Sequence, residues 1–92
     1  MEKQLIKGVS LIKNSEYRKK ILMSLSDVNY LTPSEIAEKT KIRLNHVSNF
    51  LKDLKDQELI KCLNDNEKRG RLYQITSLGK EVLKYESSSN AK

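Results

Sequence analysis

The side chains best suited to chemistry lie in one short stretch, residues 43–55, and they are hydrogen-bond donors and acceptors rather than nucleophiles. Its basic and neutral polar members are Arg43, Asn45, His46, Ser48, Asn49, Lys52 and Lys55. Amide, imidazole and guanidinium groups can hydrogen-bond the edges of nucleic-acid bases, whereas ammonium and hydroxyl groups suit phosphates. These residue types therefore favour recognition of a nucleic acid.

Residue types that support catalysis or metal binding are scarce. The chain has one histidine and one cysteine, Cys62, with no Cys-x-x-Cys pair and no Cys/His cluster. Catalysis needs convergent groups in a cleft, and a structural zinc ion needs four ligands. We therefore expect neither an enzyme nor a metal or other cofactor, and we expect Cys62 to be a small buried apolar residue.

The apolar residues of the same stretch recur at spacings of three and four, which predicts a helix with one buried face. They are Leu44, Val47, Phe50, Leu51 and Leu54. The helix should begin near Leu44 and end near Gln57 or Glu58, with the polar set on its other side. Asp56 and Glu58 suit neither the helix dipole nor phosphates, so that end should point away from a nucleic acid.

A second helix is predicted directly before this one. Thr32 is a favourable N-cap, Pro33 suits the first helical position, and Glu35 completes a capping box. Ala37 leaves room for a close helix crossing, and Ile42, in the turn that follows, can fill the gap between the two helices. The pair of helices would thus be held at a fixed angle.

Residues 32–54 resemble a helix-turn-helix. The resemblance rests on Ala37, Ile42, Val47 and Phe50. Lys41 departs from the common pattern, because many such motifs have Gly there and a left-handed lysine costs roughly 1 kcal/mol. Arg43 stands where Ser or Thr often caps the second helix, and a missing cap costs about 1 kcal/mol. Arg43 could serve nucleic-acid binding instead.

The residues that follow resemble the wing of a winged helix, with Leu59–Leu63 and Gly70–Thr76 as its strands. The Ser15–Leu22 opening and the Gly70–Tyr73 segment are similar to those of small archaeal winged-helix transcriptional regulators related to the MarR and ArsR types. This resemblance implies a mostly α fold with a small β-hairpin: a winged helix-turn-helix with a three-helix core, a wing and a C-terminal helix. It also implies a sequence-specific double-stranded DNA-binding regulator of transcription that acts as a homodimer.

We divide the chain into an N-terminal arm (1–14), a winged-helix DNA-binding domain (15–86) and a flexible tail (87–92). The arm fits either a helix or a short strand at Val9–Ile12, packed on its own domain or on a second copy. The homodimer would form through this arm, the C-terminal helix, or both.

Two further helices complete the predicted domain. The first, 15–25, has a buried face of Tyr17, Ile21, Leu22 and Leu25. Its cations, which form either a solvated face or a contact with the DNA backbone, are Arg18, Lys19 and Lys20. The second helix, 77–85, is capped by Thr76 and places Leu78, Val82 and Tyr85 on one face. Between the two helices, Tyr30 and Leu31 can pair with the wing sheet.

Charge agrees with a polyanionic partner. The formal net charge is +6 and the pI is about 9.5. Between Lys39 and Lys55, five Lys or Arg residues stand against one acid, Asp53. No apolar run approaches the length of a membrane span and no signal-peptide pattern opens the chain, so we expect a cytoplasmic protein without a membrane partner.

The resulting prediction assigns each polar side chain a partner on DNA. Base contacts are expected from Arg43, Asn45, His46 and Asn49, and backbone contacts from Ser48, Lys52, Lys55 and Arg71. The wing should contact DNA through Lys68 and Arg69. The alternative is a winged helix that serves as a protein–protein interaction module in a transcription or replication assembly.

Overall fold

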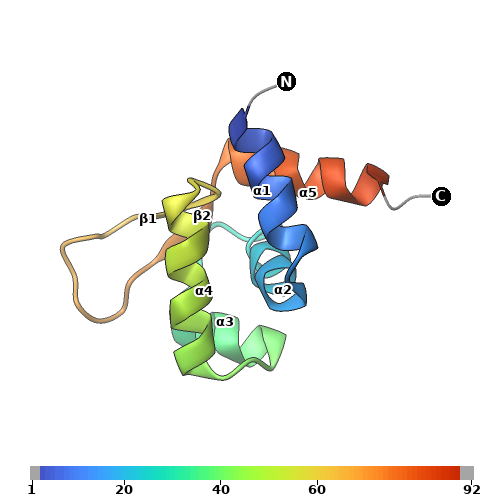
Figure 1. Ribbon diagram of the computed structural model, residues 1–92. Coiled ribbons are helices and arrows are strands. Elements are labelled where there is room, and N and C mark those ends of the chain that lie inside the picture. The colour runs from blue at the N-terminus through green and yellow to red at the C-terminus, as the bar shows by residue number, and fades with distance from the viewer. Residues whose placement is uncertain (1–2, 90–92) are drawn as a thin grey trace.

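The computed structural model describes residues 3–89, which form five helices and a two-stranded sheet (Figure 1). In chain order these are α1 (Lys3–Lys13), α2 (Glu16–Ser24), α3 (Pro33–Thr40), α4 (Leu44–Asp56), β1 (Ile60–Cys62), β2 (Tyr73–Ile75) and α5 (Ser77–Ser89). The predicted fold class, mostly α with a small β-hairpin, is confirmed. The α3–turn–α4 unit is the helix-turn-helix, and the hairpin with its long loop is the wing.

Aliphatic faces of α2, α3 and α4 meet in the core, which suits a chain without tryptophan. Its most deeply buried side chains in these helices are Ile21, Leu22, Ile36, Val47, Leu51 and Leu54. Burying one such side chain contributes about 1.5–3 kcal/mol relative to leaving it exposed. Ile42, in the turn, is also buried against this core, as predicted. The apolar spacing of α4 therefore decides which of its faces meets solvent.

The sheet is antiparallel, with Ile60 opposite Ile75 and Cys62 opposite Tyr73. Leu31 adds a one-residue bridge on the other side of β2, where its N–H and C=O exchange hydrogen bonds with Tyr73 at 3.0 and 2.9 Å. The prediction that Tyr30 and Leu31 pair with the wing sheet is thus confirmed for Leu31, whereas Tyr30 lies outside the bridge and is exposed. This bridge ties the segment before α3 to the base of the wing.

Helix α1 settles the choice between helix and strand for the arm, since the described part of it, from Lys3, is helical. It crosses α5 and also packs on α2, burying Leu5 and Ile12 (Figure 1). A Cβ added to Gly8 would come within 2.7 Å of Val82 Cγ2. Gly8 weakens the helix by propensity, yet its missing side chain allows α1 and α5 to approach closely.

Helix α5 begins as predicted, because the Thr76 hydroxyl accepts a hydrogen bond from the Gly79 N–H at 3.0 Å. It continues to Ser89, beyond the predicted end at Tyr85 and into the segment 87–92 that we expected to be a tail. The remaining parts of that tail and of the arm, residues 90–92 and 1–2, lie outside the described residues.

Four side chains are more exposed than the sequence predicted. Tyr17, Leu44 and Tyr85 are 45–49% exposed, and Cys62 is half-buried. Leu44 is the first residue of α4 and precedes Val47, the first residue of this helix that is buried in the core. Tyr17 lies at the rim, with its ring edge-on to Phe50 at 5.7 Å between centroids, so its hydroxyl can stay in water. Helical periodicity thus predicts which face of a helix is buried but not how exposed the residues at the edges of that face are.

Candidate DNA-binding surface

Local chemistry fixes how the two helices of the motif meet. The Thr32 hydroxyl accepts from the Glu35 N–H at 3.2 Å, and the Glu35 carboxylate accepts from the Thr32 N–H at 2.9 Å, so the predicted capping box is present. Lys41 adopts the left-handed conformation with φ of 62°. Arg43 is extended and makes no side-chain capping bond to α4. Both predicted departures from the usual turn are therefore real, and Arg43 remains exposed.

The polar side of α4 faces solvent along nearly its whole length. Its exposed polar and basic residues are Arg43, Asn45, His46, Ser48, Asn49 and Lys52. Asn45, Asn49 and Lys52 follow one another at i, i+4 and i+7, and so form one line along the helix. The buried Val47 and Leu51 lie on the other side. The structure thus brings the predicted contacts of α4 onto one surface.

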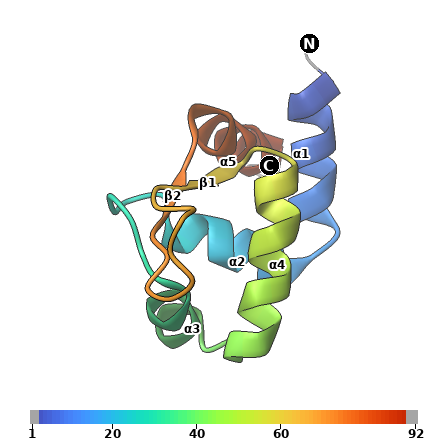
Figure 2. The same ribbon diagram turned by 90° about the vertical axis from the view of Figure 1, so that its left-hand side faces the viewer.

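A groove of about 850 Å³ lies between the Ser48 and Lys52 edge of this surface, the start of α3 and the wing. Its lining residues do not include the predicted base readers Arg43, Asn45, His46 and Asn49. Figure 2 looks onto the side of the molecule where α4 and the wing lie next to each other. Among the described residues that line the groove, five are cationic: Lys52, Lys55, Lys68, Arg69 and Arg71. A single acid, Asp56, accompanies them there. Cations far apart in the sequence are therefore combined into one basic groove.

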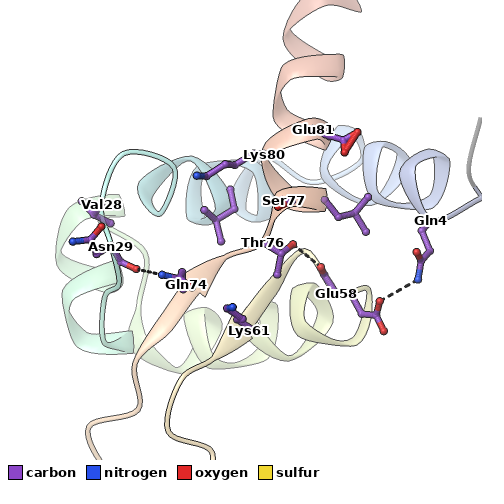
Figure 3. A pocket seen from close by; sticks show the side chains of 12 residues that line it. Gln4, Val28, Asn29, Glu58, Lys61, Gln74, Thr76, Ser77, Lys80 and Glu81 are labelled. Carbon is purple, nitrogen blue, oxygen red and sulfur yellow. Dashed lines mark hydrogen bonds between the residues drawn. The ribbon is translucent and has the colours of Figure 1, made fainter.

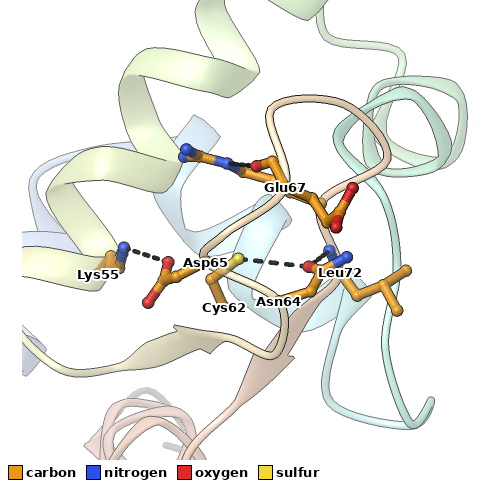
Figure 4. Close-up of polar contacts among 7 residues, drawn as sticks. Lys55, Cys62, Asn64, Asp65, Glu67 and Leu72 are labelled. Carbon is orange, nitrogen blue, oxygen red and sulfur yellow. Dashed lines mark hydrogen bonds and ion pairs between the residues drawn. The ribbon is translucent and has the colours of Figure 1, made fainter.

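The wing owes its shape to Asn64, which bridges the two ends of the loop (Figure 4). Its amide donates to the Gly70 carbonyl at 3.2 Å, and its side-chain oxygen accepts from the Leu72 N–H at 2.8 Å. The Arg71 Nε donates to the Glu67 carbonyl at 2.7 Å and braces the tip. Asn64 is not among the residues that the sequence predicted for the site. An Asn just after a strand can bond the nearby backbone through both its amide and its side-chain oxygen, and this could have pointed to its role in the loop.

Lys55 has an intrachain partner within this groove. Its Nζ lies 2.9 Å from Asp65 Oδ1 at the root of the wing (Figure 4). The hydrogen bond to Asp65 raises the pKa of Lys55, and the same bond lowers the pKa of Asp65. In contrast, within residues 3–89 the side chains of Lys52, Lys68 and Arg69 form no ion pair or hydrogen bond. These three cations are available to a partner.

The helix-turn-helix that carries this surface matches a known family of proteins. The family model described as "Bacterial regulatory protein, arsR family" matches residues 15–61, about half of the chain, from α2 to β1. The chain belongs to the arsR family. The match supports a helix-turn-helix domain of a DNA-binding transcriptional regulator. The archaeal character and the MarR likeness have no such support and stay predictions.

Two solved structures of Lactococcus lactis ZitR, both of its C30AH42A mutant, are also similar to this arsR-family chain. The first is 35% identical, has a TM-score of 0.69, and covers 80% of this chain and 51% of its own. The second, an apo form, is 32% identical with a TM-score of 0.69, covering 89% of this chain and 63% of its own. The chain thus spans less than two thirds of either ZitR chain. The comparison with curated proteins found no match.

A second basic cluster of this arsR-family chain is used within the fold. The Arg18 guanidinium pairs with Asp53 at 2.9 Å, donates to the Leu11 carbonyl at 3.4 Å, and lies 5.5 Å from the Phe50 ring centroid. Lys19 pairs with Glu86 of α5 at 2.9 Å. Neither expectation for this cluster, a solvated face or a contact with DNA backbone, anticipated these pairs.

A second groove, of about 720 Å³, lies beside the sheet and the start of α5 (Figure 3). Its charged lining among the described residues is mixed: Lys61, Lys80, Glu58 and Glu81. Gln4 donates to the Glu58 carboxylate at 3.1 Å, and Gln74 donates to the Asn29 carbonyl at 3.0 Å. Balanced charge gives this groove no preference for a polyanion, unlike the groove between α4 and the wing.

No helix between residues 3 and 89 is both long and apolar enough to cross a membrane. The same part of the chain holds no group of three or more His, Cys, Asp or Glu residues placed to bind a metal ion.

Proposed function

We propose that this arsR-family domain binds double-stranded DNA in a sequence-specific manner, with α4 in the major groove and the wing on the adjacent backbone or minor groove. One observation carries the proposal: Lys52 and Lys55 of α4 and three cations of the wing line a single basic groove. Lys52, Lys68 and Arg69 from the two elements are exposed there. Phosphate attraction of this kind supplies affinity and register on the duplex.

Base recognition is assigned to the start of α4, because the first turns of a recognition helix reach deepest into the groove. The proposed readers are Arg43, Asn45, His46 and Asn49. Each of the two Asn residues can make two hydrogen bonds to adenine, and Arg43 can do the same with guanine. The guanidinium of Arg43 has no acceptor and so cannot cap α4, and its side chain is exposed, which leaves it free to reach DNA.

Backbone contacts are assigned to the groove and the wing. The proposed residues are Ser48, Lys52, Lys55 and Arg71, with Lys68 and Arg69 at the wing tip. Lys55 must exchange its bond to Asp65 for a phosphate. Arg71 can keep its Nε bond to Glu67 while its terminal nitrogens face a phosphate. The wing would then approach DNA with its conformation already set.

We further propose a homodimer formed through α1 and α5, since one module reads few base pairs. A shallow hollow of about 370 Å³ lies between these helices. Ile6 and Tyr85 line it and are 57% and 49% exposed. Such exposed apolar side chains beside a hollow suit a second copy of the same surface. Sedimentation equilibrium of the wild type and of Ile6→Glu tests this, with loss of dimer expected for the variant.

The first experiment is fluorescence anisotropy with a pooled random duplex, repeated at several salt concentrations. Specific and non-specific binding should both weaken with salt, since phosphate contacts release counterions. Selection from the pool should then yield a preferred sequence. Asn45→Ala with Asn49→Ala should relax that preference by about 1–3 kcal/mol for each lost base contact.

A matched control removes two other exposed amides, through Asn14→Ala with Asn29→Ala, and should keep the preference. An unchanged preference in the Asn45/Asn49 double variant would contradict the assignment of these residues as readers. Lack of binding at low salt would contradict DNA binding itself and would favour the protein-interaction alternative.

A further inference from the structure

Leu44 is the first residue of α4, and 48% of its side chain is exposed. Three of the other four members of the predicted apolar face, Val47, Leu51 and Leu54, are at most 2% exposed. The fourth, Phe50, is partly buried against the core. Leu44 therefore adds little to the core. Its role must therefore be sought outside the core.

The surroundings of Leu44 distinguish it from an incidental surface leucine. It lines the basic groove between α4 and the wing, with Ser48 one turn further along the same side of the helix. Lys68 and Arg69 of the wing line the same groove. Leu63 is nearly as exposed, at 45%, but is not among the lining residues. Isolated exposed leucines are common, so position rather than exposure carries the argument.

That position is the part of a recognition helix that meets base edges. In the major groove, thymine presents a C5-methyl group, which an apolar side chain can contact. We infer that Leu44 packs against the C5-methyl group of a thymine and makes thymine the preferred base at one position of the DNA site. The inference rests on the proposed function, and it adds an apolar reader to the four polar ones.

The test replaces thymine by deoxyuridine, which removes only the C5-methyl group. Each thymine of the selected duplex is replaced in turn, and binding is measured for the wild type and for Leu44→Ala. The wild type should lose about fourfold in affinity at one position, the equivalent of one buried methyl group. Leu44→Ala should bind the thymine and deoxyuridine duplexes equally at that position, and circular dichroism should show an unchanged fold because the side chain is half exposed.

Leu63→Ala is the matched control and should keep the wild-type sensitivity to deoxyuridine. Two outcomes overturn the inference while leaving the proposed function intact: no position sensitive to the methyl group, or the same sensitivity in Leu44→Ala as in the wild type. Failure to select any preferred duplex would overturn the proposed function and the inference together. The three outcomes are therefore distinguishable.

Discussion

The chain carries two basic clusters of similar size that the fold uses in different ways. The cluster at the start of α2 consists of Arg18, Lys19 and Lys20, consecutive in the sequence. The groove cluster consists of Lys52, Lys68 and Arg69, brought together from α4 and the wing. Two cations of the α2 cluster are held by acids of α4 and α5. Those of the groove cluster have no ion pair with any residue between 3 and 89.

The difference teaches that the density of charge along a sequence does not show which cations are available to a partner. Arg18 finds Asp53 at a separation of 35 residues, once α2 and α4 pack together. A cation that is already paired must break that pair before it can bind a phosphate. The groove cluster is free of this cost, which is why it should dominate the interaction with DNA.

The largest effect should come from removing the wing cations. Lys68→Ala with Arg69→Ala should lower the slope of log K against log salt by about 2, one for each lost phosphate contact. Since counterion release drives this term, the affinity near 0.1 M salt should fall roughly 100-fold for all sequences. Fluorescence anisotropy over a salt series measures both quantities.

The control for this variant removes the same charge elsewhere, through Lys20→Ala with Lys84→Ala, both exposed. It should leave the slope within experimental error of the wild type. Equal slopes for the two double variants would show that net charge, rather than the groove, determines binding, and the comparison of clusters would fail.

The second-largest effect should be on the stability of the fold. Arg18→Ala removes an ion pair, a bond to the Leu11 carbonyl and a contact with the Phe50 ring. We expect the free energy of unfolding to fall by about 1–3 kcal/mol, as for other hydrogen bonds to charged groups. The loss should be smaller than for a buried ion pair, because Arg18 and Asp53 are partly exposed. Urea denaturation measures the change. The salt slope of DNA binding should stay constant.

Lys20→Ala is the matched change within the same cluster and should alter stability by no more than about 0.5 kcal/mol. If Arg18→Ala instead leaves stability intact and flattens the salt slope, the cation of α2 belongs to the DNA surface and the distinction between the clusters disappears.

The sequence predicted what depends on neighbours along the chain. The capping box of Thr32 and Glu35 and the buried Val47 of α4 both follow from residue type and spacing. These features obey helix periodicity and capping chemistry, which need no knowledge of the rest of the fold.

Long-range partners could not be predicted in this way. The pairs of Arg18 with Asp53 and of Lys19 with Glu86 exist only after the helices have packed. The exposure of Leu44 likewise depends on where the core ends. The proposed base readers rest on residue type, helical periodicity and the helix-turn-helix resemblance, whereas the grouping of wing and helix cations needed the geometry of the hairpin.

The third prediction concerns the wing that presents these cations. Asn64→Ala removes the bonds to Gly70 and Leu72, so the wing should sample more conformations and bind DNA about 1 kcal/mol more weakly. In the Lys68→Ala, Arg69→Ala background the same substitution should have a smaller effect on affinity, because Arg71 is then the groove cation that the wing still positions. A double-mutant cycle by anisotropy tests this. An equal loss in both backgrounds would indicate general destabilisation.

The smallest effect should come from the cation shared between the fold and the groove. Asp65→Asn releases Lys55, which then no longer has to give up a carboxylate to bind its phosphate, so the affinity for DNA should rise slightly, by a factor of roughly two, with the salt slope unchanged. Stability should change little, since both side chains are largely exposed. The pKa of Asp65 is lowered in the fold, so its stabilising effect is present above the unfolded value of about 3.9 and is lost as pH falls through the folded value. Any stability difference between wild type and Asp65→Asn should therefore be constant near neutral pH and vanish only in acid. An affinity for DNA that stays unchanged in Asp65→Asn would place Lys55 with the α2 cations, as a residue of the fold rather than of the groove.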